Sequence, residues 1–223
     1  MKEHSSIAGS PWEQSFELSY KLACEQLAKI NDMEEQCRKS GARYLGPHEI
    51  VVKYLNQPYH ITLPKDIPSC HCEADVVSRS NLVEVPLRDK ILILHYFTLA
   101  KGTPAVGRLI TYKQLPGGMS YFAAFSQRTV TPLVNRFGQN TELLIGVAAK
   151  LGGRETNYGN VSVTINAFDH VPITLVLWKG DEELAPNGNI LFDANISDYL
   201  STEDVAVLSE TITWKLVKGI PSG

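Results

Sequence analysis

The sequence predicts a single α+β domain in which an antiparallel or mixed sheet is flanked by an N-terminal, a central buried and a C-terminal helix. Two observations predict this class. Apolar residues recur every three or four positions near both ends of the chain, and they alternate with polar residues in a segment between. A chain of 223 residues buries roughly 70% of the surface that its unfolded form exposes, which is enough for one core. We expect a flexible N-terminus over residues 1–10 and one domain over residues 11–219.

The first helix is predicted to run from Pro11 to Gly41. Ser10 is a good N-cap, Pro11 suits the first helical position, and Glu13 stands three residues after the cap. Gly41 is a suitable stop. The face that this helix should bury contains Trp12, Phe16, Tyr20, Ala23, Leu27 and Ile30.

A hairpin is expected next, with strands over residues 49–55 and 59–63 around Asn56-Gln57-Pro58. Residues 64–86 read as a long loop, and loops of this length tend to be functional or mobile. Residues 86–101 contain a dense apolar run that would suit a buried helix or a central strand. The run's length and the Gly102 and Pro104 that follow it favour the helix.

The second half of the chain alternates turns, helices and strands. Pro116-Gly117-Gly118 indicates a turn before an aromatic, partly helical segment, and Asn140 could cap a short helix. The clearest strands cover residues 161–166 and 173–178, and residues 189–192 could pair back on them. Ser201-Thr202-Glu203-Asp204 opens the last helix, which Gly219 follows.

Charge and hydropathy exclude several classes of protein. The chain has 21 Lys and Arg against 24 Asp and Glu and no basic run with interleaved aromatics, so we expect no nucleic-acid partner. Its most apolar segment, residues 91–100, is about half of what a membrane span needs. No apolar run follows the first charged residues, so a secretory signal is not expected. We therefore expect a cytoplasmic protein with reduced thiols.

The strong catalytic motifs are absent from the sequence. There is no phosphate loop, no dinucleotide fingerprint, no nucleophile elbow and no His-Glu-x-x-His. Cys70-His71-Cys72 is the densest group of soft metal ligands, but neighbours one residue apart rarely all reach one ion. A solvent-facing loop with incidental cysteines is the favoured interpretation, and a metal site is the alternative.

His95 is the more specific candidate, because the predicted helix places it between apolar residues at i−4 and i+4. It could be a core histidine that bonds a backbone carbonyl. It could instead be the axial ligand to the metal of a flat macrocycle, which would need an apolar, aromatic pocket. The side chains that could line that pocket are Tyr96, Phe97, Tyr121, Phe122 and Phe125.

A second group of polar residues lies at predicted strand ends. Asp169 and His170 fall in a strand-to-strand turn, and Asp193 follows a strand. Such carboxylate–imidazole pairs can act in acid–base catalysis, although turn chemistry is the commoner use of an Asp at these positions.

Several segments of the chain resemble a bacterial family catalogued as domain of unknown function 3786. The resemblance spans nearly the whole chain, and the segments that carry it are VPLRDKILILHY at residues 85–96, QLPGG at 114–118, VPITLVLWKGD at 171–181, NILFD at 189–193 and DYL at 198–200. The family is associated with anaerobic bacteria and archaea, and some relatives resemble fusions to the iron–sulfur module of corrinoid proteins. The resemblance therefore implies a link to redox or corrinoid chemistry. Four cysteines spaced as they are here should hold no iron–sulfur cluster, so a partner protein would supply one.

Three hypotheses follow. The first is a cofactor-binding accessory protein of anaerobic redox or one-carbon metabolism that holds a corrinoid (cobalamin) or haem through His95, with an iron–sulfur or corrinoid protein as its partner. The second is a small-molecule enzyme that uses Asp169, His170 and Asp193 as acid–base groups. The third is a scaffold subunit of a redox complex, which would expose an apolar patch.

Overall fold

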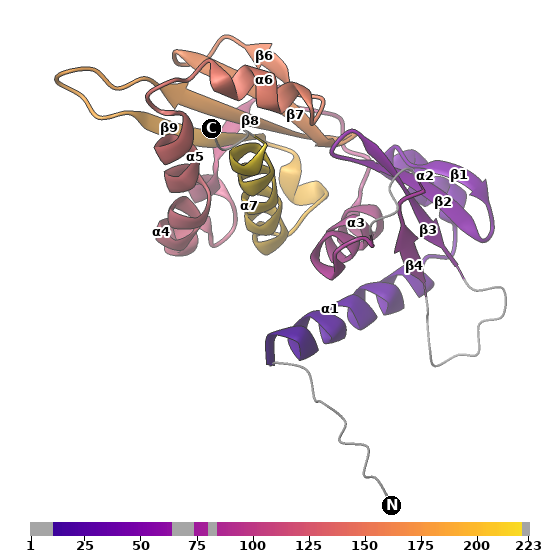
Figure 1. Ribbon diagram of the computed structural model, residues 1–223. Helices are drawn as coiled ribbons and strands as arrows, with labels where there is room; N and C mark the ends of the chain where they lie inside the picture. Colours follow the sequence, from indigo (N-terminus) through magenta and orange to yellow (C-terminus); the bar gives the residue numbers. More distant parts are fainter. Residues whose placement is uncertain (1–10, 64–73, 80–83, 220–223) are drawn as a thin grey trace, which may run out of the picture.

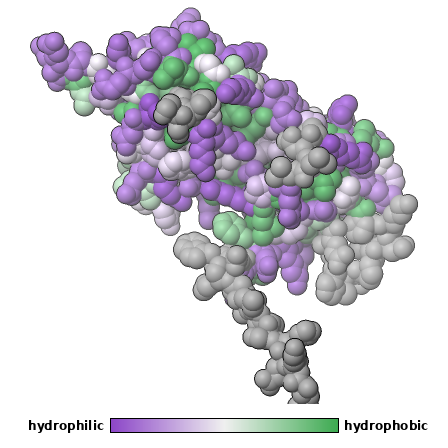
Figure 2. All heavy atoms as spheres, viewed as in Figure 1, coloured by the Kyte–Doolittle hydropathy of each residue, from purple (hydrophilic) through white to green (hydrophobic). Residues whose placement is uncertain are grey.

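The computed structural model describes residues 11–63, 74–79 and 84–219 and confirms the predicted α+β class (Figure 1). The expected flexible N-terminus and the Cys70-His71-Cys72 triplet lie outside the described residues. No helix within the described ranges is long and apolar enough to cross a membrane. The face of the molecule in Figure 2 is largely hydrophilic, and polar side chains interrupt its apolar groups.

The first half of the chain forms a four-stranded antiparallel sheet with three helices. α1 packs against α3, and α2 contacts both α3 and the edge strand β1. The strands pair in sequence order. The elements are α1 (Pro11–Ala28), α2 (Met33–Ser40), β1 (Arg43–Gly46), β2 (Glu49–Tyr54), β3 (Gln57–Thr62), β4 (Asp75–Val77) and α3 (Leu87–Leu99).

The second half forms a five-stranded antiparallel sheet in the order β5-β9-β8-β7-β6, and α4, α5 and α7 lie on one side of it (Figure 1). The elements are β5 (Leu109–Thr111), the 3-10 helix η1 (Tyr112–Gln114), α4 (Gly118–Arg128), α5 (Val130–Phe137), α6 (Leu143–Ala149), β6 (Arg154–Thr156), β7 (Val161–Phe168), β8 (Val171–Trp178), β9 (Asn187–Asp193), the 3-10 helix η2 (Ile196–Asp198) and α7 (Thr202–Lys218).

The prediction of one long N-terminal helix is wrong, because the first helix ends at Ala28 and a second helix begins at Met33. Asp32 adopts an extended conformation, and its carboxylate accepts a hydrogen bond from the backbone N–H of Glu35 at 2.9 Å. This is an N-cap, which satisfies a free N–H at the start of a new helix. Gly41 does end a helix as predicted, with φ 71°.

The predicted hairpin is confirmed, but its turn is one residue earlier than expected. Tyr54 pairs with Gln57, so Leu55 and Asn56 form the turn, with φ 46° and 64°. These angles are typical of a type I′ turn, which matches the twist of the flanking strands. A buried Leu rarely adopts this conformation, and here its N–H donates to the carbonyl of Ala167 in β7 at 2.9 Å. The strained turn therefore joins the two sheets.

The remaining predictions of secondary structure are confirmed for the long elements, whereas the short strands were not predicted. Residues 86–101 form a helix as favoured, and the strands over 161–166, 173–178 and 189–192 are confirmed within longer strands. Four strands of three or four residues were not predicted, and β4 lies within the expected long loop. An alternation over three residues is too short to distinguish from chance.

A stack of aromatic rings lies where the two halves meet. Phe168, the last residue of β7, stacks on Tyr96 of α3 with centroids 4.0 Å apart and planes 8° apart, and on Tyr54 of β2 at 4.9 Å. Tyr96 also stacks on Tyr199 at 5.9 Å, and its hydroxyl donates to the carbonyl of Ser40. All four rings are almost fully buried.

Truncating the centre of this stack should destabilise the fold strongly. Phe168 is 1% exposed, so Phe168→Ala should lower the free energy of unfolding by about 3–5 kcal/mol, through lost burial and the cavity that remains. Urea unfolding measures this change. Tyr158→Ala, at an exposed aromatic, is the control and should change stability by about 0.5 kcal/mol or less. Equal effects of the two substitutions would contradict the role of the stack.

Candidate functional site

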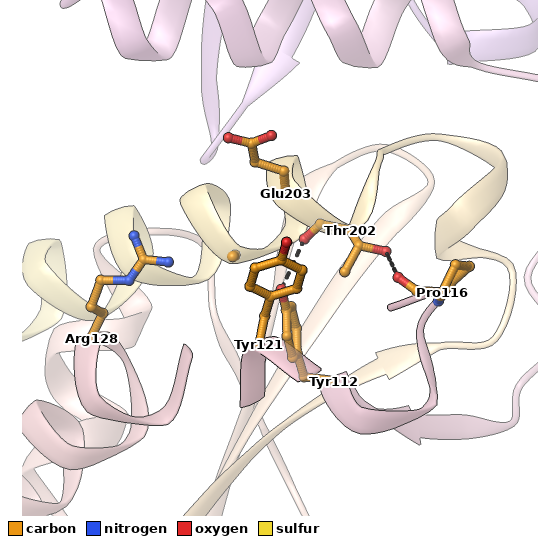
Figure 3. A pocket seen from close by; sticks show the side chains of 7 residues that line it. Tyr112, Pro116, Tyr121, Arg128, Thr202 and Glu203 are labelled. Atoms are coloured by element: carbon orange, nitrogen blue, oxygen red, sulfur yellow. Dashed lines mark hydrogen bonds between the residues drawn. The ribbon is translucent and has the colours of Figure 1, made fainter. Parts of the chain in front are cut away.

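A pocket of about 330 Å³ lies between η1, the start of α4 and the start of α7 (Figure 3). This volume is at the lower end of the range for pockets that hold small organic ligands. Its lining residues are Tyr112, Pro116, Tyr121, Arg128, Thr202, Glu203 and Ala206.

Two glycines allow the pocket to form. A Cβ on Gly118 would lie 1.9 Å from the carbonyl oxygen of Tyr112, so α4 can begin against η1 only because this residue has no side chain. Gly117 has φ 70°, which favours glycine. The hydroxyl of Thr202 donates to the carbonyl of Pro116 at 2.9 Å and ties the turn to α7. The segment predicted only as a turn is therefore one wall of the pocket.

The pocket carries opposite charges at two of its borders. In Figure 3 Arg128 lies to the left of the Tyr121 ring and Glu203 lies above it. Tyr121 is 67% exposed, so its ring and hydroxyl are available to a ligand. Arg128 lies 3.6 Å from Glu210, which Arg88 of α3 also contacts at 2.8 Å. The arrangement suits a ligand with both a planar part and polar groups.

His95 does not line this pocket, but it forms an ion pair with α7 one residue after the lining residue Glu203, whose charge also acts on it. Its Nδ1 is 2.8 Å from Oδ1 of Asp204, the residue after Glu203. The other carboxylate oxygen of Asp204 accepts from the hydroxyl of Ser201 at 2.6 Å, in the capping box that starts α7. His95 is therefore hydrogen-bonded to a carboxylate, and not to a backbone carbonyl as one of the sequence-based interpretations had it. Its Nε2 has no hydrogen-bond partner within the described part of the chain.

The surroundings of His95 favour its protonated form. The hydrogen bond to Asp204 raises the pKa of His95 above 6.5, partial burial opposes the rise, and the charges of Asp204 and Glu203 add to it. The side chain is 30% exposed, so a ligand can approach it. A histidine oriented in this way can exchange a proton or bind a metal through Nε2.

The aromatic residues predicted around His95 do not converge on it. Tyr96 is buried in the stack between the two halves, and Phe125 is buried against Tyr112 at 4.0 Å. Tyr121 lines the pocket, while half-buried Phe122 lies beneath the ammonium group of Lys113 at 4.2 Å. Phe97 is fully buried. Of the five aromatics predicted around the histidine, Tyr121 alone lines this pocket.

Asp193 stabilises a loop. Its carboxylate accepts hydrogen bonds from the backbone N–H groups of Val106, Gly107 and Asn195 at 2.7–3.1 Å. Burial alone would raise the pKa of Asp193, but these three donors, helped by Arg108, outweigh it and lower the pKa. Both oxygens of Asp193 are therefore engaged, and they hold the loop between α3 and β5 in place.

Asp169 and His170 lie in the β7–β8 turn, as predicted, and they approach Gly41. A Cβ on Gly41 would lie 3.0 Å from Oδ2 of Asp169 and 3.3 Å from Nε2 of His170. The two side chains therefore flank one point, away from the pocket beside His95. Asp193 does not complete the group, because its oxygens are already bonded.

The structure adds no further ligands to the metal ligands that the sequence predicts, among the residues that it describes. No group of three or more His, Cys, Asp or Glu side chains that could hold an ion occurs among the residues that the structure describes. Cys70, His71 and Cys72 lie outside them. Cys24 and Cys37 are buried thiols that form no disulfide with each other. Burial, with the charge of Glu34 adding to it, raises the pKa of the Cys37 thiol to about 11.

Asp89 is a functional candidate that the sequence did not indicate. It is 5% exposed, it accepts from the hydroxyl of Tyr54 at 3.3 Å, and it lies 4.0 Å from Lys215. Burial raises the pKa of Asp89, although Lys215, Tyr54 and Arg88 all oppose the rise. Buried ionisable groups of this kind are common at functional sites and in structural networks alike.

The fold and the pocket define an α+β protein with two antiparallel sheets and a ligand-sized cavity beside an oriented histidine. Its sequence places it in a family: the chain belongs to the family described as domain of unknown function (DUF3786), whose match covers residues 32–214. No curated protein and no solved structure matches the chain.

The His95–Asp204 pair should show itself in a proton titration. NMR of the imidazole signals should give His95 a pKa above 6.5, and Asp204→Asn should lower that pKa because the amide carries no charge. Since the folded-state pKa is raised, the pair stabilises the fold below about pH 6.5, and this contribution is lost as the pH rises through the raised pKa. His95→Gln should therefore destabilise the protein more at about pH 5.5 than at about pH 8.5.

Asp89→Asn should show a pH dependence of the same sign in a more acidic range. The pKa of Asp89 is raised above 3.8 in the fold, so ionising it costs stability as the pH rises from 3.8 through the raised value. The neutral Asn avoids that cost, and the variant's stability relative to wild type should increase over this window. Urea unfolding at a series of pH values tests this, and a constant difference would contradict it.

Proposed function

We propose that this protein is a cofactor-binding accessory protein whose binding site extends from the pocket between η1, α4 and α7 to His95. The observation that carries the proposal is the hydrogen bond from Nδ1 of His95 to Asp204 at 2.8 Å. A carboxylate on Nδ1 fixes the tautomer of the ring and makes the other nitrogen a better donor to a metal.

The class of cofactor in this proposal is a metallo-tetrapyrrole, either a corrinoid or a haem. When bound, such a group supplies redox or alkyl-transfer chemistry at its metal. The described residues fit the ligand part of this requirement through Nε2 of His95. Among the aromatic residues predicted to line the cofactor pocket, Tyr121 alone lines the pocket found here. We therefore assign no contact with the cofactor to Tyr96 or Phe125.

The biological setting belongs to the same proposal. A role in anaerobic redox or one-carbon metabolism in the cytoplasm, beside a partner that carries an iron–sulfur cluster or a corrinoid, rests on the family resemblance. No residue in the pocket is assigned a chemical step, which is why an accessory role is proposed here.

A small-molecule enzyme is the second candidate, and one observation favours it. Asp169 and His170 flank a single point above Gly41, which is the arrangement that proton transfer between neighbouring groups needs. Asp193 is no longer part of this hypothesis, because three backbone N–H groups occupy its carboxylate.

An absorption titration with hemin and with cobalamin tests the first candidate. We expect a saturable spectral shift at one equivalent that His95→Ala abolishes and that His48→Ala, at an exposed histidine, leaves unchanged. Asp204→Asn should weaken binding by about 10–100-fold. Binding should strengthen as the pH rises through the pKa of His95, because the metal competes with the proton for Nε2.

Circular dichroism of each variant separates loss of the ligand from loss of the fold. A spectrum that shifts equally in wild type and in folded His95→Ala would exclude His95 as the ligand. A wild-type titration without any saturable shift would exclude the tetrapyrrole.

A further inference from the structure

A second pocket, of about 250 Å³, lies where the first sheet meets the β7–β8 turn of the second half. Pockets between two structural units are common places for ligands. Its polar lining comes from Arg43, Lys53, Asn56 and Asp169, and Gly41 also lines it. None of these residues takes part in the site beside His95.

Two cations share one wall of this pocket. Arg43 of β1 lies opposite Val51 of β2, and Lys53 follows Val51 by two residues in β2. The side chains of Arg43 and Lys53 therefore project from the same face of the sheet. Both residues are exposed, and neither forms an ion pair with the residues that the structure describes. Neighbouring cations that form no ion pair attract an anion to the space between them.

The opposite wall has a different character. Asp169 reaches across from the second half and approaches Gly41, where the missing side chain leaves room for its carboxylate. An ionised carboxylate can only accept hydrogen bonds, and Asp169 has no donor within the described ranges. A simple anion would be repelled at this end, whereas a hydroxyl or amino group would be bound.

We propose that this pocket binds a small organic phosphate that carries a hydroxyl group. Arg43 and Lys53 hold the phosphate, since a guanidinium forms paired hydrogen bonds with phosphate oxygens and an ammonium adds a point charge. Asp169 accepts the hydrogen bond of the hydroxyl. His170, whose Nε2 lies near the same point, stands beside that contact.

The site is independent of any cofactor at His95, so the two proposals succeed or fail separately. It also gives the enzyme candidate a ligand class, because the bound hydroxyl would lie against Asp169 and His170. No reaction is assigned to it.

Titration calorimetry of the full chain with glycerol 3-phosphate and with inorganic phosphate tests this proposal. Glycerol 3-phosphate should saturate at one equivalent and bind about tenfold or more tightly than inorganic phosphate, because only it has a hydroxyl for Asp169. Arg43→Ala and Lys53→Ala should each weaken both ligands by about tenfold or more. Lys179→Ala, at an exposed lysine outside the pocket, is the matched control and should change neither affinity.

Asp169→Asn distinguishes the contribution of Asp169 to binding from that of the two cations. It should remove most of the preference for glycerol 3-phosphate while inorganic phosphate binds as well as before or better, since a repulsive charge is gone. Wild-type affinity in both cation variants would overturn the phosphate site, and so would the absence of saturable binding in the wild type. A preference that survives in Asp169→Asn would overturn the role of the hydroxyl.

Discussion

The structure depends on the contact between Phe168 and Tyr96. These two rings stack at 4.0 Å and join the end of a strand in one sheet to the helix that covers the other. Tyr54 and Tyr199 extend the stack, and the hydrogen bond between Leu55 and Ala167 fixes the adjoining turn. The left-handed conformation of Leu55 costs of order 1 kcal/mol or more. The burial of the aromatic rings at the same junction outweighs that cost, which is why a strained residue persists there.

Much of the fold could be predicted because its larger elements have long periodic patterns. The central helix and β7 and β8 are examples, each with enough apolar residues to establish a period. The break after Ala28 was missed because a single capping side chain at Asp32, and not a change of pattern, starts α2. The short strand β5 exists through pairing with β9, which is distant in the sequence, and local propensity does not report such pairing. β1 and β6 pair with the next strand along the chain but are too short to show an alternation.

The candidate site was predictable only in part. His95 was identified from its position on an apolar helix face, but its partner Asp204 is 109 residues away in the sequence. Asp204 was noted only as part of a helix start, and Pro116-Gly117-Gly118 only as a turn within one of the family segments. In the fold these two local features meet and supply Pro116, Thr202 and Glu203 to the lining of the pocket. The segments of the family resemblance that include Asp193, Asp198 and Tyr199 mainly fasten the loop before β5, through bonds to Val106, Gly107 and Thr103.

Asp204 divides its two carboxylate oxygens between separate tasks. One caps the first turn of α7, and the other holds the imidazole of His95. The protonation or ligation of the histidine and the order of that helical turn are therefore thermodynamically linked, and each must influence the other by the same free energy. Because Thr202 and Glu203 belong to that turn and also line the pocket, occupancy of the pocket and protonation of the imidazole would influence each other through the turn, in addition to any direct contact.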